Sequence, residues 1–322
     1  MIRARLSILL LLISILPISQ AQATDVVYPG ERPFTLVVPT KYQAGTPAPL
    51  IIALHGYTAE NPYAESYFAL GKVADEKGIL TVYPSGSKDS NGYLFWNATP
   101  ACCNFDSSTV DDEAYLLSII DSVSKDYSVD PARVYLMGHS NGGFMAHRMA
   151  CNQSDRIAAI VSLAGTTYSN PKSCKPTSPV SVLQIHGTID AVITYTGGYL
   201  FSSAYPSARK TIDLWGKLNE CGKKPYRVLP RLDLDSKLSG LETTVLRYKG
   251  CKTGASTELW TINKGRHSPE LSATFAKSGC VVVKVAAISA ARLSNSEVVT
   301  PSYIPSITLI EILIGSTTSF NP

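Results

Sequence analysis

The sequence carries little net charge. Its 29 basic and 25 acidic residues leave only +4 over 322 residues, and the basic residues are scattered along the chain. Proteins that bind nucleic acid or anionic membranes usually concentrate positive charge in one segment or on one face. We therefore expect no nucleic-acid partner.

The spacing patterns of a metal site are also missing. The chain has 7 cysteines and 5 histidines, yet no two cysteines form a Cys-x-x-Cys pair and no two histidines lie four residues apart. Zinc sites in proteins usually use such pairs. We expect neither a metal ion nor an organic cofactor.

No apolar run is long enough to cross a bilayer as a helix, which takes about 20 residues. The run from Leu6 to Ile18 is shorter, Arg3 and Arg5 precede it, and Ala21-Gln22-Ala23 follows it. This order is typical of a cleaved signal peptide. We expect the first 23 residues to be removed, which gives a secreted protein, extracellular or periplasmic, with no integral membrane association.

The rest of the chain alternates short apolar runs with helix-like segments. Several of the runs contain no polar alternation, as expected of parallel strands that are buried on both faces. Such an order predicts one α/β domain over residues 24–277, with a mostly parallel central sheet and helices on both faces. The expected strands are 33–39, 49–56, 79–84, 133–138, 157–165, 180–187 and 258–263, and the expected helices are 66–77, 112–125, 143–151 and 208–219.

A Gly-x-Ser-x-Gly pattern follows the strand at 133–138 directly. Gly138 and Gly142 lack the Cβ atoms that would clash in a sharp turn from strand to helix, and such a turn lifts the hydroxyl of Ser140 above the sheet. A serine hydroxyl needs a histidine base and an acid that orients the histidine. Ser140 is the candidate nucleophile, and a loop serine is the alternative.

The order of residues along the chain narrows the choice of partners. After this type of turn the acid comes next and the histidine last. Only His267 follows every plausible acid, and Asp190 alone leaves the end of an apolar strand, in the loop after His186. The structural alternatives are a turn aspartate and a surface-loop histidine.

Two backbone amides are expected to bind the oxyanion of the tetrahedral intermediate. One belongs to Asn141, after the nucleophile, and the other to Tyr57, in the glycine-containing loop after an early strand. His55 is expected to support this loop, and Asp111 and Asp112 to cap a helix. Trp96 either lines a binding cleft or is a partly buried loop aromatic.

These residues together resemble the poly(3-hydroxybutyrate) depolymerase-like esterases, which are related to the feruloyl and acetylxylan esterases of carbohydrate esterase family 1. The matching stretches include "LHGY", "FWN", "VDD", "RVYLMGHSNGGFMAHRMAC", "IHGTIDAVITYTGG" and "ELWTINKGRHSPELSATFAK", within residues 33–277. The resemblance implies an α/β-hydrolase fold and assigns the catalytic triad to Ser140, Asp190 and His267.

The expected function is therefore that of a secreted, monomeric serine esterase that forms an acyl-enzyme. Its substrates would be esters of hydroxyalkanoate oligomers, or acetyl or feruloyl esters on plant polysaccharide. Two alternatives remain: a pseudo-esterase that binds polymer or carbohydrate without turnover, and a serine peptidase.

The sequence departs from the family in two places. Arg266 stands where relatives often have glycine, and could crowd or charge the site. Residues 278–322 have no sustained helical period, so the tail is either frameshifted, disordered or an added β segment. Without its Cys280, six cysteines remain, for which we expect the bonds Cys151–Cys174 and Cys221–Cys251, with Cys102 and Cys103 forming a strained vicinal bond or staying reduced.

Overall fold

The computed structural model describes residues 22–59 and 61–272. The expected signal peptide, apart from its last two residues, lies outside this part of the chain. So do the tail from residue 278 and Cys280.

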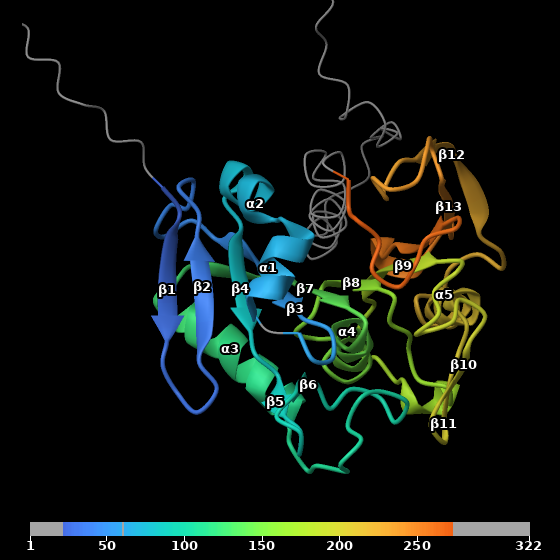
Figure 1. Cartoon of the computed structure of the whole chain (residues 1–322). Helices are drawn as coiled ribbons and strands as arrows, with labels where there is room; N and C mark the ends of the chain where they lie inside the picture. Colours follow the sequence, from blue (N-terminus) through green and yellow to red (C-terminus); the bar gives the residue numbers. More distant parts are fainter. Residues whose placement is uncertain (1–21, 60, 273–322) are drawn as a thin grey trace, which may run out of the picture.

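A ten-stranded sheet forms the centre of the molecule (Figure 1), with the strand order β1-β2-β4-β3-β7-β8-β9-β14-β13-β12. The strands from β4 to β14 in this order pair in parallel, whereas the strands at the two ends pair antiparallel. This confirms the mostly parallel sheet. Its strands are β1 (Thr24–Tyr28), β2 (Phe34–Val38), β3 (Ala48–Leu54), β4 (Leu80–Pro84), β7 (Val129–His139), β8 (Ala159–Leu163), β9 (Ser181–Gly187), β12 (Tyr226–Leu232), β13 (Thr243–Arg247) and β14 (Thr257–Ile262).

Smaller elements complete the described part of the chain. Two short hairpins lie outside the main sheet. They pair β5 (Ser87–Lys88) with β6 (Leu94–Phe95) and β10 (Gly198–Leu200) with β11 (Ser203–Tyr205). The helices are α1 (Asn61–Phe68), α2 (Gly71–Lys77), α3 (Asp112–Asp126), α4 (Asn141–Asn152) and α5 (Ala208–Leu218), and the 3₁₀ turns are Pro171–Ser173 and Lys252–Gly254.

The apolar runs form strands that are buried on both faces because helices cover both sides of the sheet. In β3, Leu50 and Ile52 pack into one core with side chains of α3 and α4, whereas Ile51 and Ala53 pack into a second core with side chains of α1 and α2. Successive side chains of a strand point to opposite faces, so a strand between two helix layers must be apolar throughout.

One expected helix is divided in two. The apolar spacing predicts a single helix over 66–77, but the structure has α1 and α2 with a break between them. At the break, Ala69 has a φ of 47°, in the left-handed region that a right-handed helix does not continue through. The bend lets Phe68 and Val73 both enter the second core.

The acids at the start of α3 have different roles. The side chain of Asp111 accepts a hydrogen bond from the backbone N–H of Ala114 and so caps the helix, as expected. Asp112 instead turns inward, where it pairs with Arg32 at 2.6 Å and accepts the backbone N–H of Asn97. It therefore ties α3 to the loop that precedes it.

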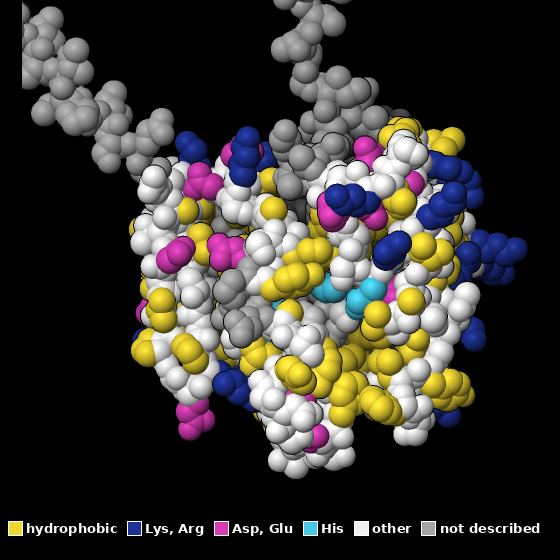
Figure 2. All heavy atoms as spheres, in the orientation of Figure 1, with side chains coloured by type: hydrophobic (Ala, Val, Ile, Leu, Met, Phe, Trp, Pro, Cys, Tyr) yellow, Lys and Arg dark blue, Asp and Glu magenta, His cyan; other side chains and the backbone are white. Residues whose placement is uncertain are grey.

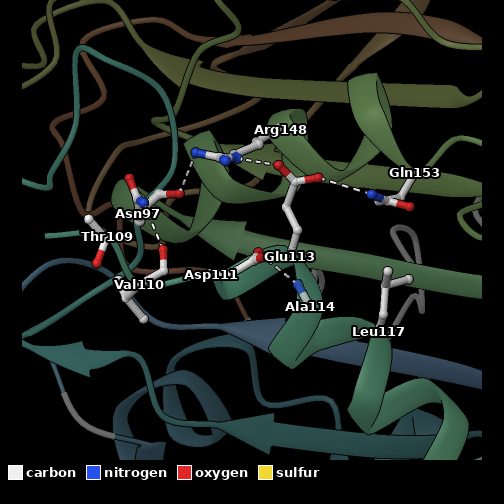
Figure 3. Close-up of a pocket in the computed structure, with 9 residues that line it drawn as sticks. All are labelled: Asn97, Thr109, Val110, Asp111, Glu113, Ala114, Leu117, Arg148 and Gln153. Carbon is white, nitrogen blue, oxygen red and sulfur yellow. Dashed lines mark hydrogen bonds and ion pairs between the residues drawn. The ribbon is translucent and has the colours of Figure 1, made fainter.

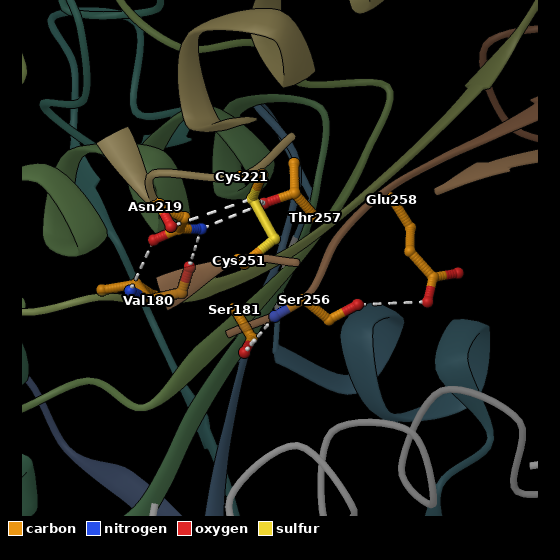
Figure 4. The surroundings of a disulfide bond; sticks show 8 residues. All are labelled: Val180, Ser181, Asn219, Cys221, Cys251, Ser256, Thr257 and Glu258. Carbon is orange, nitrogen blue, oxygen red and sulfur yellow. Dashed lines mark hydrogen bonds between the residues drawn. A yellow bond between two sulfur atoms is a disulfide. The ribbon is translucent and has the colours of Figure 1, made fainter. Parts of the chain in front are cut away.

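The described residues form three disulfides, Cys102–Cys103, Cys151–Cys174 and Cys221–Cys251. The last closes a loop whose ends are 30 residues apart and which carries β13 and the edge strand β12. A loop of that length corresponds to about 3.5 kcal/mol of stabilisation in the chain-entropy description. Beside it, the Asn219 amide donates to the carbonyl of Val180 and to the hydroxyl of Thr257 (Figure 4).

Candidate active site

The backbone of Ser140 is strained. The residue lies between β7 and α4 with a φ of 53° and a ψ of −117°, a conformation that residues other than glycine rarely adopt. Such strain usually marks positions where a fold holds a functional group in place. The side chain is 7% exposed, at the carboxyl end of the central strand.

The two glycines beside Ser140 are required by close backbone contacts. A Cβ atom on Gly138 would lie 2.1 Å from the carbonyl oxygen of Gly142, and one on Gly142 would lie 2.4 Å from that of Leu54. The start of α4 is therefore pressed against the ends of β7 and β3, and any larger residue would force the turn open.

Ser140, His267 and Asp190 form a hydrogen-bonded line. Nε2 of His267 lies 2.9 Å from Oγ of Ser140, and Nδ1 lies 2.8 Å from Oδ2 of Asp190. Because a carboxylate only accepts, Nδ1 carries the proton and donates it to Asp190, and Nε2 accepts the hydroxyl proton of Ser140. This is the protonation state that a general base needs.

The pairing of β9 with β14 brings Asp190 and His267 together. The two strands run in parallel and end opposite each other, with Ile262 beside Gly187. Beyond them the loops are joined by hydrogen bonds from the Ile189 amide to the carbonyl of Gly265, and from the Lys264 amide to the hydroxyl of Thr188. Residues 77 positions apart thus meet.

Asp190 is held as a carboxylate. Its Oδ1 accepts the backbone N–H groups of Val192 and Ile193 at 2.8 and 2.9 Å. Burial opposes ionisation, but hydrogen bonds from His186 and His267 outweigh it and keep the pKa of Asp190 well below its usual range. The contact of His186 with Asp190, at 3.3 Å, was not expected from the sequence.

The loop that carries Tyr57 passes beside the nucleophile. A Cβ atom on Gly56 would lie 3.5 Å from Cβ of Ser140. His55 supports the loop as expected: its Nδ1 donates to the carbonyl of Gly56, and its Nε2 accepts the N–H of Gly86. Asn141 is the first residue of α4, so both candidate amides belong to segments next to Ser140.

Trp96 does not line a cleft, which corrects one of the two readings of its sequence context. Its side chain is 0% exposed, and its indole N–H donates to the carbonyl of His55. The side-chain amide of Asn141 binds both the N–H and the carbonyl of Trp96. The tryptophan therefore supports the loop at 55–57 from below.

His139 packs under His267. Its Nε2 donates to the backbone carbonyl of His267 at 3.0 Å, and the two rings lie 5.0 Å apart. Its sequence position, inside the turn and next to Ser140, gave no sign of this contact, because the loop of His267 comes 128 residues later. Arg266, the departure noted in the sequence, is exposed.

Aromatic side chains border the site on one side. Tyr57 contacts Tyr93 and Phe105 edge-on, at centroid distances of 6.2 and 5.4 Å, and Phe105 contacts Phe201 at 4.9 Å. We call Tyr57, Tyr93, Phe105 and Phe201 the aromatic rim. Figure 2 shows histidine side chains at the centre of this face, bordered by hydrophobic ones.

A cavity of about 430 Å³ lies at the start of α3 and the end of α4, lined by polar groups (Figure 3). Two of its charged side chains are paired: Glu113 accepts hydrogen bonds from Arg148 and Gln153, and Arg148 also donates to the carbonyl of Asn97. These groups join the two helices.

The stability of the protein should depend on pH through three buried histidines. Burial lowers the pKa of His55, His139 and His147 to about 4. In the unfolded chain such side chains take up protons below about pH 6.5, whereas in the fold they stay neutral until about pH 4. The free energy of unfolding should be highest above pH 6.5 and fall toward pH 4, by up to about 3 kcal/mol per histidine.

Urea denaturation at steps between pH 7.5 and 4.5 measures this dependence. A midpoint that stays constant across the range would contradict the neutral, buried state of these rings. In His147→Gln, the fall in the free energy of unfolding between pH 7.5 and 4.5 should be smaller by about the contribution of one histidine.

The described residues contain no group of three or more His, Cys, Asp or Glu side chains that could hold a metal ion. Nor does any helix between residues 22 and 272 have the length and apolar character to span a membrane.

The chain is similar in sequence to proteins named as esterases. It is 28% identical over 239 residues to feruloyl esterase B of Piromyces equi, covering 71% of this chain and 41% of the relative. It is 24% identical over 243 residues to feruloyl esterase D of Neurospora crassa, covering 74% of each. The chain thus spans about two fifths of the first relative's length.

The same fold is found among solved structures. The acetyl xylan esterase from Aspergillus awamori matches 79% of this chain and 96% of its own, with a TM-score of 0.55 at 15% identity. A family model described as phospholipase/carboxylesterase matches residues 40–216, more than half of the sequence. The chain therefore has the α/β-hydrolase fold and belongs to the phospholipase/carboxylesterase family.

Proposed function

We propose that this chain is a serine esterase in which Ser140 is the nucleophile, His267 the general base and Asp190 the acid that orients the base. Ser140 attacks the ester carbonyl while His267 takes its proton and passes it to the leaving alcohol. Water, activated by His267, then hydrolyses the acyl-enzyme. The amides of Tyr57 and Asn141 stabilise the oxyanion in both steps.

One observation carries this proposal. The hydroxyl of Ser140, both ring nitrogens of His267 and the carboxylate of Asp190 follow one another at 2.9 and 2.8 Å, on the strained turn between β7 and α4. A structural serine needs neither the strain nor the ordered base. A purely binding protein would have no use for the fixed protonation state of the ring.

The aromatic rim favours esters with an apolar or planar group. Phe105 and Phe201 are 43% and 83% exposed. Exposure of apolar surface to water is unfavourable, and a bound apolar group would cover it. Feruloyl and hydroxyalkanoate esters provide such a group, and an acetyl group alone does not. The names of the two relatives agree with the feruloyl class.

The three disulfides support export to an oxidising compartment. Together with the sequence pattern of the first 23 residues, they favour a secreted enzyme, extracellular or periplasmic. We propose that it acts as a monomer on soluble or oligomeric esters.

A fluorophosphonate probe tests the chemistry directly. The folded protein should form one covalent adduct per chain, and a peptide map should place it on Ser140, because only an activated serine attacks the phosphorus. Protein unfolded in urea is the control and should stay unlabelled. Folded protein without an adduct would instead support the pseudo-esterase alternative, and cleavage of casein at a rate above that of any ester would support the peptidase.

The rim is tested by Phe105→Ser. We expect KM for methyl ferulate to rise about fivefold, the equivalent of one aromatic contact of about 1 kcal/mol, with little change for ethyl acetate. The control, Val27→Ser, removes an exposed apolar side chain on β1 and should change neither. Equal effects on the two esters would show that the rim does not bind the acyl group.

A further inference from the structure

A line of buried polar side chains leads from α5 to the acid of the candidate triad. The indole nitrogen of Trp215 lies 3.0 Å from Nδ1 of His147, whose Nε2 lies 2.9 Å from Oε1 of Gln184. Nε2 of Gln184 lies 3.3 Å from Nδ1 of His186. The four side chains are 0% exposed and come from α4, α5 and β9, which are labelled in Figure 1.

The direction of every hydrogen bond in this line is determined by its first member. An indole N–H only donates, so Nδ1 of His147 accepts and the proton of that ring sits on Nε2. His147 therefore donates to Oε1 of Gln184. The amide of Gln184 also donates to the carbonyl of Gly165 at 2.8 Å, which independently fixes which end carries the nitrogen.

The last member, His186, faces two acceptors. Its Nδ1 accepts from Gln184, so its proton sits on Nε2 and the ring is neutral. That N–H donates to the carbonyl of Ile193 at 2.7 Å, and Oδ2 of Asp190 lies 3.3 Å from the same nitrogen. Oδ2 is also the atom that accepts the N–H of His267.

Both oxygens of Asp190 are therefore in contact with donor groups. Backbone amides hold Oδ1, and the two histidines share Oδ2. A carboxylate held on both oxygens cannot rotate away from His267. Because the two histidines share Oδ2, the negative charge that faces His267 is shared with the N–H of His186.

We propose that His186 is a positioning residue of the esterase site, and that the line Trp215–His147–Gln184 fixes its tautomer so that its N–H stays on Asp190. This inference rests on the proposed function. Within it, His186 sets both the orientation of Asp190 and the basicity of His267, without touching the substrate.

Other titratable groups of the described residues also face these rings, and His139 is close enough to His186 for their charges to interact. The ring of Tyr195 lies edge-on to His186 at 5.8 Å, and its hydroxyl is bound to Thr261. His267 faces Asp190 and the ring of His139, while the neighbouring Arg266 is exposed.

The test compares His186→Leu, which removes the donor, with His186→Gln, which keeps an N–H. We measure the acid limb of kcat/KM for p-nitrophenyl butyrate, and the pKa of His267 by NMR of histidine-labelled protein. In His186→Leu both should move up by about one pH unit, with kcat about tenfold lower and KM within about twofold. His186→Gln should stay within about 0.3 unit of the wild type.

Trp215→Phe tests the far end of the line, since it removes the indole N–H and keeps most of the volume. We expect the acid limb and the NMR pKa of His267 to shift in the same direction as in His186→Leu, by about half as much. Trp260→Phe is the matched control: it removes another buried indole N–H, which donates to Glu258 and takes no part in the line, and it should not move the limb.

Two results would overturn the proposal. If His186→Leu leaves the acid limb of the kcat/KM profile and the NMR pKa of His267 as in the wild type, His186 only fills space. If Trp215→Phe leaves both unchanged while His186→Leu shifts them, the line does not fix the tautomer. Because the NMR titration needs no turnover, it still tests His186 if the wild type hydrolyses no ester, a result that would contradict the proposed function alone.

Discussion

Ser140→Ala should lower kcat for p-nitrophenyl butyrate by about 10⁶-fold, because removing the nucleophile of a serine triad costs about as much as removing all of its members. The hydroxyl is the group that forms the acyl-enzyme, and no other serine lies on the line from Asp190 through His267. Alanine keeps the Cβ atom, so the turn at Ser140 and the packing of α4 should be preserved.

The control for this variant is Ser162→Ala. Ser162 is a serine of β8 with 0% exposure, and its hydroxyl has no hydrogen-bond partner within the described residues. Its loss should leave kcat within about twofold of the wild type, since no contact of the site depends on it. If Ser140→Ala were as active as Ser162→Ala, another residue would have to be the nucleophile.

The central strands and α4 were predictable from the sequence because their local pattern and their final environment agree. β3 is an uninterrupted apolar run and β9 a largely apolar one, and both are buried along their whole length in the structure. Helices covering both faces make an apolar residue favourable at every position of such a strand. Fold class therefore follows from short-range sequence information.

Elements that depend on distant contacts were missed. β12 has four exposed residues of seven and contains Pro230, a pattern typical of a loop, and it becomes a strand by pairing with β13. The break falls on Ala69, a residue type that favours helix, and the glycine nearby, Gly71, already belongs to α2. Here the packing of Phe68 and Val73 outweighs local propensity.

The candidate site was also predictable only in part. The order of residues selected Ser140, Asp190 and His267, and parallel strands place their carboxyl ends at one edge of the sheet, which is where the three meet. Their catalytic role stays a prediction. The burial of Trp96 and the contact of His186 with Asp190 could not be foreseen, since each depends on a hydrogen bond formed in the folded loops.

Asp190→Asn should lower kcat by about 10⁴-fold, although the variant is almost the same shape. Its oxygen should stay at the Oδ1 position, where the amides of Val192 and Ile193 both need an acceptor. The new NH₂ group then lies where Oδ2 was and faces Nδ1 of His267. Since two donors repel, His267 should move its proton to Nε2, and that nitrogen can no longer accept from Ser140.

The same NH₂ group would also face the N–H of His186, so one donor conflict would remain after His267 changes its tautomer. The variant's free energy of unfolding should therefore fall as well, by about 1–3 kcal/mol.

Asp213→Asn is the control, because Asp213 pairs with Arg209 on the exposed side of α5. It should keep full activity, and a similar loss in both variants would mean that the charge of Asp190 has no special role. KM for p-nitrophenyl butyrate should change little in Asp190→Asn, because the carboxylate lies behind His267 and its conflict with that ring disables proton transfer while the substrate still binds.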